Sequence, residues 1–276
     1  MSSGSETAAP KTPDAPLILS ERAGRAFVIT LNRPDKLNAI NEPMAAELMA
    51  ALDAAEADRE VIAVILQGNE RAFCAGADLS GFSDAPEDRY DSYRARYNQR
   101  KTRTIFRHLH NFTKPVISAV EGFCLGGGLE LALFGDFIVA GDAAQFALPE
   151  ARHGLIPGAG GTQNLPRRIG PALAKELMWT ARRLSAADAK DIRLVNHVVP
   201  TGEALAKAKS IVGEMEASGP LAIMMIKQAV NRGAEMPVAL GFYQESDLAQ
   251  LLAFSEDRQE GVKAFAEKRK PKFKGQ

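Results

Sequence analysis

The sequence predicts an α/β protein, and three observations support this. Short apolar segments alternate with segments of helical periodicity over roughly the first two-thirds of the chain. Two of the apolar segments, 61–66 and 116–120, are continuous, which is typical of parallel strands buried on both faces. From about residue 203 the pattern is helical only. Alternating strands and helices favour an α/β core, and the change near residue 203 indicates a helical subdomain after it.

The first elements are a hairpin and a helix. Residues 17–20 and 26–31 flank Ala-Gly-Arg and are typical of a β-hairpin. Residues 43–58 carry apolar side chains at helical spacing, with Asn41 as the expected N-cap and Pro43 in the first turn.

The middle of the chain alternates strands with helices. The expected strands lie at 61–66, 116–120, 137–140 and 145–147. The segment 68–81 is expected to be a loop, and helices are expected at 87–110 and from the glycine triplet at 126–128 to about residue 134. After residue 203 four helices are expected, at 204–215, 221–232, 237–254 and 256–269. Gly-Pro and Met-Pro pairs separate the second and third of these from their predecessors.

Composition excludes several classes of partner. Lys+Arg and Asp+Glu balance at 34 each, so no overall positive charge recruits nucleic acid or an anionic membrane. No apolar run reaches the roughly 20 residues of a membrane span. The two cysteines suit a reducing compartment, and the four histidines show no metal-ligand spacing. We therefore expect no nucleic-acid partner, no membrane association and no metal.

The N-terminal residues suggest a tail rather than a targeting signal. Residues 1–16 have no basic start, no apolar segment and no arginine, which argues against a secretory or mitochondrial leader. The expected organisation is a disordered tail (1–16), a catalytic core (17–202) and a helical oligomerisation subdomain (203–276). A cytoplasmic location is expected.

Two groups of peptide amides are candidate ligand donors. At 126–128, three glycines open a helix although each loses more freedom on ordering than alanine would. Amides at a helix N-terminus lack intrahelical partners and lie at the positive end of the dipole, so that of Gly127 is a candidate donor. In RAFCAGADL, Gly76 permits a turn that leaves the amide of Ala77 free. Two amides converging on one oxygen form an oxyanion hole for an acyl compound. Tight helix–sheet packing is the alternative explanation of the triplet.

Two glutamates accompany these amides. Glu130 lies three residues after Gly127, hence on the same helical face. Glu150 follows Pro149 just after an expected strand. Two carboxyl groups near one carbonyl can divide the roles of acid and base if their surroundings separate their pKa values. Either glutamate alone would be read as a solvent-exposed side chain.

These motifs resemble the crotonase, or enoyl-CoA hydratase/isomerase, superfamily. The resemblance is carried by NRPDKLNAI (32–40), FCAGADL (73–79), KPVISAVEGFCLGGGLELALFGDFIVA (114–140), FALPEARHGLIPGAGGTQNLPRRIG (146–170) and AFAEKRKPKFKG (264–275). It implies a spiral of ββα units with a helical C-terminal trimerisation region, and assembly as a homotrimer or a homohexamer.

The resemblance also assigns roles to residues. Ala77 and Gly127 match the oxyanion-hole positions, and Glu130 and Glu150 match the two catalytic carboxylates of the hydratase branch. Gly158 matches a position whose backbone helps to hold the catalytic water. Candidate contacts with coenzyme A are Lys36, Ala39, Asp78 and Leu79. Candidate residues of the acyl pocket are Phe82, Tyr90, Tyr93, Tyr97 and His153, and for His153 the alternative is a surface side chain.

The implied activity is that of an enoyl-CoA hydratase, a lyase that adds water in syn fashion to a trans-2-enoyl-CoA thioester and forms a 3-hydroxyacyl-CoA. Glu130 is expected to deprotonate water and Glu150 to protonate C2. No cofactor is expected, because coenzyme A is part of the substrate. The alternatives are an enoyl-CoA isomerase, a dehydratase of a specialised acyl-CoA such as a carnitinyl-CoA-like substrate, or a non-catalytic acyl-CoA-binding or RNA-associated scaffold. One departure from the family pattern is Arg193, which stands where a glycine is usual.

Overall fold

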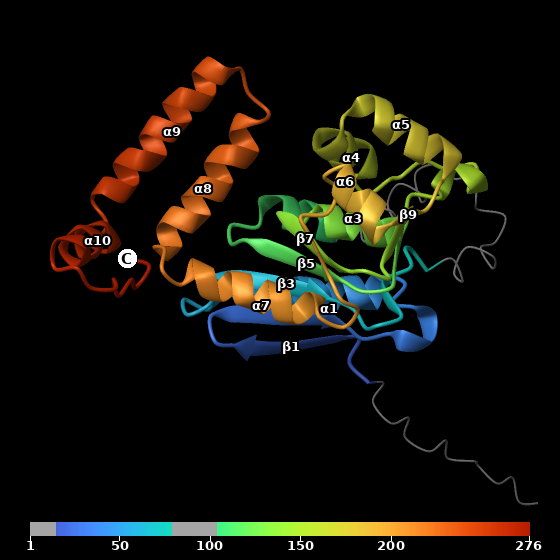
Figure 1. Cartoon of the computed structure of the whole chain (residues 1–276), viewed down its shortest axis with the longest axis horizontal. Coiled ribbons are helices and arrows are strands. Elements are labelled where there is room, and N and C mark those ends of the chain that lie inside the picture. The colour runs from blue at the N-terminus through green and yellow to red at the C-terminus, as the bar shows by residue number, and fades with distance from the viewer. Residues whose placement is uncertain (1–14, 79–103) are drawn as a thin grey trace, which may run out of the picture.

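The computed structural model describes residues 15–78 and 104–276, and a six-stranded sheet forms its centre (Figure 1). The strand order is β1-β2-β3-β5-β7-β10, and every neighbouring pair is parallel except the antiparallel hairpin β1–β2. The strands are β1 (Ile18–Ala23), β2 (Ala26–Leu31), β3 (Ala63–Gln67), β5 (Val116–Val120), β7 (Phe137–Gly141) and β10 (His197–Val199). The predicted α/β class and the N-terminal hairpin are confirmed.

A second, four-stranded sheet takes three of its strands from the segments that directly follow β3, β5 and β7. Its order is β4-β6-β8-β9, with only β9 antiparallel to its neighbour. The strands are β4 (Ala72–Cys74), β6 (Phe123–Leu125), β8 (Gln145–Ala147) and β9 (Leu184–Ser185). The successive pairs β3/β4, β5/β6 and β7/β8 each place their first strand in the large sheet and their second in the small one. The chain therefore advances as a repeated two-strand unit.

The large sheet is covered on both faces, which explains its continuous apolar strands. Helix α7 (Ala204–Met215) packs its buried Ala204, Ala208 and Val212 against one face. Helix α1 (Glu42–Ala57) and the small sheet belong to the hydrophobic cluster on the other face. Alternate residues of β3 accordingly join different clusters, and all five residues of β5 are buried. This double burial confirms what the continuous strands predicted.

The remaining helices are short ones around the small sheet and longer ones near the C-terminus. They are η1 (Pro34–Lys36), α3 (Gly127–Leu133), η4 (Glu150–His153), α4 (Gly161–Ile169), α5 (Pro171–Thr180), α6 (Ala186–Asp191), α8 (Pro220–Gly233), α9 (Val238–Ala253) and α10 (Glu256–Ala266). Residues 104–111 are also helical, whereas 87–103 of the predicted helix lie outside the described residues. Asn41 caps α1 as predicted, since its side chain accepts the amide of Met44 at 3.0 Å.

Two sequence predictions about local structure are wrong. The predicted loop at 68–81 contains strand β4, because the three-residue run Ala72-Phe-Cys74 is too short to show periodicity but is fully buried between neighbours. The last helix ends at Ala266 rather than at residue 269, since Lys268 adopts a left-handed conformation (φ 54°).

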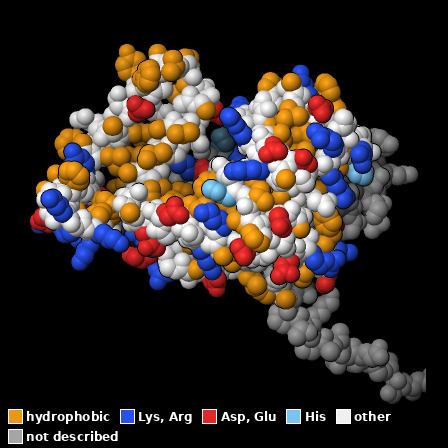
Figure 2. All heavy atoms as spheres, viewed as in Figure 1, with side chains coloured by type: hydrophobic (Ala, Val, Ile, Leu, Met, Phe, Trp, Pro, Cys, Tyr) orange, Lys and Arg blue, Asp and Glu red, His pale blue; other side chains and the backbone are white. Residues whose placement is uncertain are grey.

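Helices α8, α9 and α10 project from the sheets as an arm (Figure 1). We call residues 220–266 the arm. Within it, the residues of α8 and α9 that are buried are Pro220 and Leu248 alone. Apolar side chains instead gather on its surface, as Figure 2 shows. The large ones are Ile226, Val230, Met236, Val238, Leu240, Phe242, Tyr243, Leu251, Phe254, Val262 and Phe265.

Arg193 occupies a backbone position that favours glycine. Its φ is 64°, and its amide donates to the carbonyl of Lys190 at 3.0 Å in the turn after α6. A side chain in the left-handed region costs roughly 1 kcal/mol. The family's glycine at this position is thus explained by the turn, and here an arginine keeps the same turn.

No helix within the described ranges 15–78 and 104–276 is long and apolar enough to cross a membrane. The predicted tail lies almost entirely outside the described residues, and the cytoplasmic location stays a prediction.

Candidate active site

The peptide between Gly76 and Ala77 is held so that its N–H points away from the loop that supports it. The carbonyl of Gly76 accepts the amide of Ile40 at 2.8 Å, and the amide of Asp78 donates to the carbonyl of Ile40 at 2.9 Å. In a trans peptide the C=O and N–H point in opposite directions. The N–H of Ala77 is therefore directed to the side opposite Ile40. Gly76 has a φ of 111°, which favours glycine at this position.

The peptide between Gly126 and Gly127 presents a second amide in the same way. The carbonyl of Gly126 accepts the amide of Glu130 at 3.0 Å and so begins helix α3. The N–H of Gly127 consequently points out of the N-terminal end of that helix. Gly126 is fixed on its other side, since its own amide donates to the carbonyl of Ala147 at 2.8 Å.

The two amides lie side by side. A Cβ atom added to Gly127 would lie 3.4 Å from the nitrogen of Ala77, and one added to Gly76 would lie 3.3 Å from the nitrogen of Gly127. Within the described part of the chain, neither amide donates a backbone hydrogen bond. Ala77 is exposed and Gly127 is partly exposed. The arrangement offers one acceptor atom from outside two N–H donors at once.

Glu130 lies on α3, one turn after Gly127, and is almost fully buried at 3% exposure. Its Oε1 accepts the amides of Ala159 at 2.7 Å and Gly161 at 2.8 Å. Gly161 is the first residue of α4, so the carboxylate also meets the positive end of that helix. Backbone donors of this kind favour the ionised form of a carboxyl group.

Glu150 is the first residue of the short helix η4 and has different surroundings. It is partly buried, and its Oε2 is enclosed without a hydrogen-bond partner among the described residues. Burial raises the pKa of Glu150 to about 7; its own backbone amide opposes that rise, and the charge of Glu130 adds to it. Its Oε1 lies close to Gly126, where an added Cβ would stand 3.2 Å away.

The structure therefore brings four of the predicted residues together. Ala77 and Gly127 supply adjacent amides, Glu130 follows on the same helix, and Glu150 lies against Gly126 and interacts electrostatically with Glu130. The carboxyl group of Glu130 accepts two backbone amides from another segment, whereas Oε2 of Glu150 is enclosed without a partner among the described residues. This difference separates a proton acceptor from a proton donor near neutral pH.

The other predicted site residues in the described chain lie around this centre. Lys36 is exposed on η1, and Ala39 accepts a hydrogen bond at its carbonyl from Arg33 at 3.0 Å. The same guanidinium pairs with Asp78 at 2.5 Å. Gly158 is exposed, and it is the neighbouring amides of Ala159 and Gly161 that reach Glu130.

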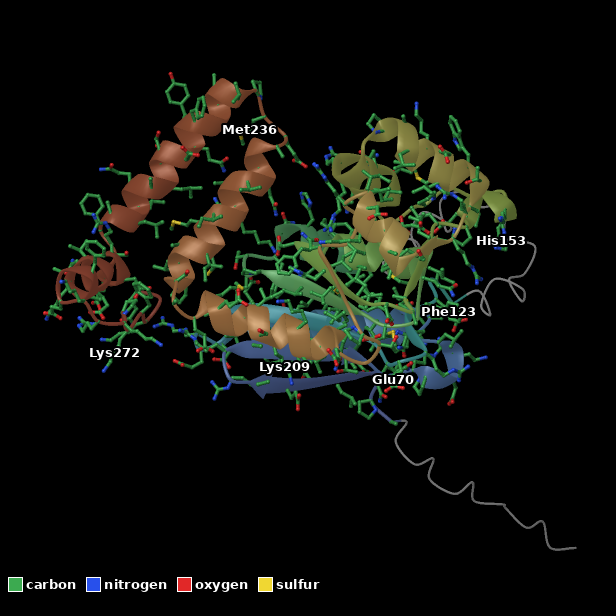
Figure 3. All side chains as sticks on the ribbon, in the orientation of Figure 1. Glu70, Phe123, His153, Lys209, Met236 and Lys272 are labelled. Atoms are coloured by element: carbon green, nitrogen blue, oxygen red, sulfur yellow. The ribbon has the colours of Figure 1, made fainter. Side chains whose placement is uncertain are left out.

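His153 is exposed at the end of η4, and Figure 3 shows it at the edge of the molecule near α5. The remaining predicted residues fall outside the described part of the chain, and their roles stay predictions. They are Leu79, Phe82, Tyr90, Tyr93 and Tyr97.

Sequence reasoning missed several residues that support the site. Asn38 is fully buried with a φ of 57°, and its amide group donates to the carbonyls of Ala72 and Phe73 at 2.9 and 3.1 Å. It thereby attaches the loop containing Ile40 to strand β4. The sulfur of Cys74 accepts the amide of Gly76 at 3.4 Å. An asparagine at position 38 is compatible with a left-handed backbone. The sequence alone does not single it out, because asparagine is also common in ordinary surface turns.

Both cysteines are buried free thiols. Burial raises the pKa of Cys74 to about 12 and that of Cys124 well above its usual value, so both are neutral. Among the described residues, no group of three or more His, Cys, Asp and Glu side chains is placed to hold a metal ion.

Known proteins match nearly the whole chain. The family model described as enoyl-CoA hydratase/isomerase matches residues 21–276. A probable enoyl-CoA hydratase of Rhizobium meliloti is 44% identical, covering 93% of this chain and 97% of its own length. The 2,3-dehydroadipyl-CoA hydratase of Escherichia coli is 38% identical, with 94% and 98% covered. The crystal structure of an enoyl-CoA hydratase from Bacillus anthracis superimposes with a TM-score of 0.89 at 37% identity, covering 94% and 100%.

Proposed function

This chain belongs to the enoyl-CoA hydratase/isomerase family, and we infer from that membership and from its paired glutamates that it is an enoyl-CoA hydratase. The reaction is the addition of water across the 2,3 double bond of a trans-2-enoyl-CoA thioester, which makes the protein a hydro-lyase. The observation that carries the inference is the placement of two carboxyl groups in unlike surroundings beside two adjacent amide donors.

The amides of Ala77 and Gly127 are proposed to bind the thioester oxygen. When water adds at C3, negative charge moves onto that oxygen as the enolate forms. Two fixed donors stabilise this charge more than they stabilise the neutral carbonyl, and each such donor typically contributes about 3 kcal/mol to the transition state.

The two glutamates are proposed to complete the addition. Glu130 removes a proton from water, whose oxygen bonds to C3, and protonated Glu150 delivers its proton to C2. The product is a 3-hydroxyacyl-CoA, and the proton gained by Glu130 restores Glu150 by exchange. The addition is proposed to be syn, as the family resemblance implies. The two groups titrate as a coupled pair, so their apparent pKa values belong to both.

Substrate binding and assembly involve residues outside this centre. Lys36 and Ala39 are proposed to contact the coenzyme A moiety, as the family resemblance implies. Lys36 is exposed, and the carbonyl of the next residue, Leu37, accepts the amide of Ala75 at 2.9 Å. Acid–base chemistry of this kind requires no metal ion or redox cofactor. The arm, with its exposed apolar side chains, is proposed to join copies of this chain in a trimer or a dimer of trimers.

The test is turnover of a set of CoA thioesters. Crotonyl-CoA, longer and more polar 2-enoyl-CoA thioesters, 3-enoyl-CoA and 3-hydroxybutyryl-CoA are supplied separately, and loss or gain of the conjugated double bond is followed by absorbance. Hydration of 2-enoyl thioesters and the reverse dehydration are expected. Conversion of 3-enoyl-CoA without hydration would instead identify an isomerase, and no turnover of any thioester would contradict the inference.

Glu150→Gln is the decisive variant. Glutamine keeps the shape of the side chain but has no carboxylic proton to deliver to C2, so we expect the hydration rate to fall by about 10²- to 10⁴-fold. Glu176→Gln is the matched control, because Glu176 lies on α5 with an exposed side chain and only a weak ion pair at 3.6 Å. Steady-state kinetics with crotonyl-CoA measures both variants. Near-normal activity of folded Glu150→Gln would contradict the assigned role.

A further inference from the structure

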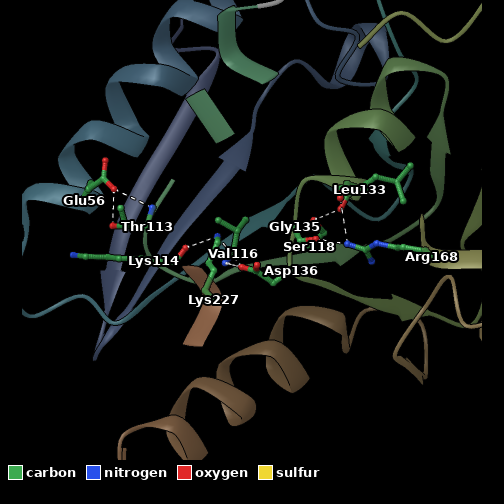
Figure 4. Close-up of polar contacts among 11 residues, drawn as sticks. Glu56, Thr113, Lys114, Val116, Ser118, Leu133, Gly135, Asp136, Arg168 and Lys227 are labelled. Carbon is green, nitrogen blue, oxygen red and sulfur yellow. Dashed lines mark hydrogen bonds and ion pairs between the residues drawn. The ribbon is translucent and has the colours of Figure 1, made fainter. Parts of the chain in front are cut away.

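A partly buried arginine of α4 holds the C-terminal end of α3. Nη2 of Arg168 donates to the carbonyl of Leu133 at 3.2 Å and to the carbonyl of Gly135 (Figure 4). The last carbonyls of a helix lack intrahelical partners and form the negative end of its dipole. Burial lowers the pKa of Arg168 and the charge of Asp136 raises it, but a guanidinium remains charged in proteins. Arg168 therefore places a positive charge at the end of α3.

The opposite end of the same helix pair carries the reciprocal contact. Glu130, in the first turn of α3, accepts the amides of Ala159 and Gly161 at the start of α4. The N-terminal ends of α3 and α4 are thus hydrogen-bonded to each other, and so are their C-terminal ends. Each helix contributes one charged side chain to the complementary end of the other.

We propose that Arg168 is a positioning residue for hydration, because it fixes α3 against α4 and thereby sets where Glu130 and the amide of Gly127 stand. This inference rests on the proposed function. Helix α3 has only seven residues, so about 9 Å separates its two ends. A tilt of a helix this short moves both of its functional groups. The serine hydroxyl of Ser118 donates to the carbonyl of Ala132 at 3.0 Å, but from the sheet rather than from α4.

The test compares Arg168→Met with Arg22→Met. Methionine keeps an apolar stem but cannot donate to either carbonyl. Arg22 lies on the edge strand β1, is half-exposed and pairs with Asp58 only at 3.7 Å, so its replacement controls for loss of an arginine in general. A misplacement of about 1 Å lowers catalysis by about 10²-fold. We expect kcat of Arg168→Met for crotonyl-CoA to fall by about 10- to 100-fold with KM within about threefold of the wild type, and no change for Arg22→Met.

A spectroscopic measurement separates positioning from stability alone. Donors that polarise the thioester carbonyl of a conjugated ligand such as cinnamoyl-CoA are expected to shift its absorption to longer wavelength on binding. In folded Arg168→Met this red shift is expected to decrease, because the amide of Gly127 has moved. An unchanged red shift together with unchanged kcat per folded molecule would overturn the proposal, even if the variant unfolds at a lower temperature.

A double-mutant cycle tests the connection to Glu130. Once Glu130→Gln has removed the carboxylate, Arg168→Met is expected to cost less in kcat than it does in the wild type. Independent losses would overturn the proposal. Arg168→Lys keeps the charge but lacks the planar fork that reaches two carbonyls. If Arg168→Met does not fold, Arg168→Lys takes its place in the test. Its kcat is then expected to lie between those of the wild type and an inactive enzyme, and a wild-type kcat would overturn the proposal. Absence of hydration by the wild type would instead contradict the proposed function.

Discussion

At the scale of single residues, the site is governed by the contrast between Glu130 and Glu150. The sequence could indicate that both carboxyl groups lie near one carbonyl, because Glu130 shares a helical face with Gly127. The family resemblance implied their roles as base and acid, but the local pattern did not predict the difference in their surroundings. That depends on the amides of Ala159 and Gly161, thirty residues away, and on the enclosure of Oε2 of Glu150. Long-range contacts of this kind leave no local signal.

The raised pKa of Glu150 predicts how hydration depends on pH. Its pKa is about 7 instead of the usual 4.5, chiefly because of burial. Only the protonated carboxyl can protonate C2, so the rate is expected to fall as pH rises through about 7 and to approach a tenfold decrease per pH unit above it. Measuring kcat/KM for crotonyl-CoA between pH 5 and pH 9 tests this. A rate that stays constant to pH 9 would show that Glu150 does not donate the proton.

The same shift predicts an effect on stability. Because folding raises the pKa of the Glu150 carboxyl group, ionising that group lowers the free energy of unfolding. This loss of stability is absent below about pH 4.5 and is complete above about pH 7. Glu150→Gln removes this penalty. After allowance for partial exposure, we expect the variant to be about 1 to 2 kcal/mol more stable than the wild type at pH 8 and no more stable at pH 4. Urea denaturation at both pH values measures it, and a variant less stable at pH 8 would refute the expectation.

At the scale of elements, the sequence revealed the long segments and the three-residue strand β8, but missed other short ones. Helix α7 begins and ends where its pattern predicts, because twelve residues show the apolar stripe that packs on the sheet. Strand β4 has only three residues, too few for periodicity to distinguish it from a loop. Yet β4 positions Cys74 and Gly76, so one of the short elements is the one that leads into the amide of Ala77. Its pairing with β6 is specified by tertiary contacts, not by its own residues.

Asn38 links this strand to the N-terminal loop, which predicts a large effect of an isosteric change. In Asn38→Asp the two hydrogen bonds to Ala72 and Phe73 are lost, and a carboxylate is buried facing two carbonyl oxygens. We expect the free energy of unfolding to fall by about 3 to 5 kcal/mol. Asn69→Asp is the matched control, since the Asn69 side chain only accepts, from the amides of Arg71 and Ala72, and aspartate can do the same. Equal denaturation midpoints for the two variants would refute this assignment.

At the scale of the whole molecule, a lysine of α8 ties the arm to the core. Lys227 of α8 is 8% exposed at its side chain and bonds to Asp136 at 2.9 Å and to the carbonyl of Lys114 at 2.8 Å (Figure 4). Asp136 also accepts the amide of Val116 at 2.7 Å. This junction lies just after α3, so the position of the arm is set beside the end of the helix that carries Gly127 and Glu130. Composition alone predicted a helical subdomain but not this point of attachment.

The apolar surface of the arm predicts self-association. Phe242 on α9 and Phe254 just after it are 63% and 76% exposed. Soluble monomers rarely expose so large a group of apolar side chains, and such a patch usually marks an interface. We expect light scattering to give the mass of a trimer or a hexamer, and the double variant Phe242→Glu/Phe254→Glu to give mainly monomer. Leu19→Glu, an exposed apolar position on the edge strand β1, is the control and should keep the wild-type mass. A wild-type monomer, or an assembly unaffected by charges in the arm, would place the interface elsewhere.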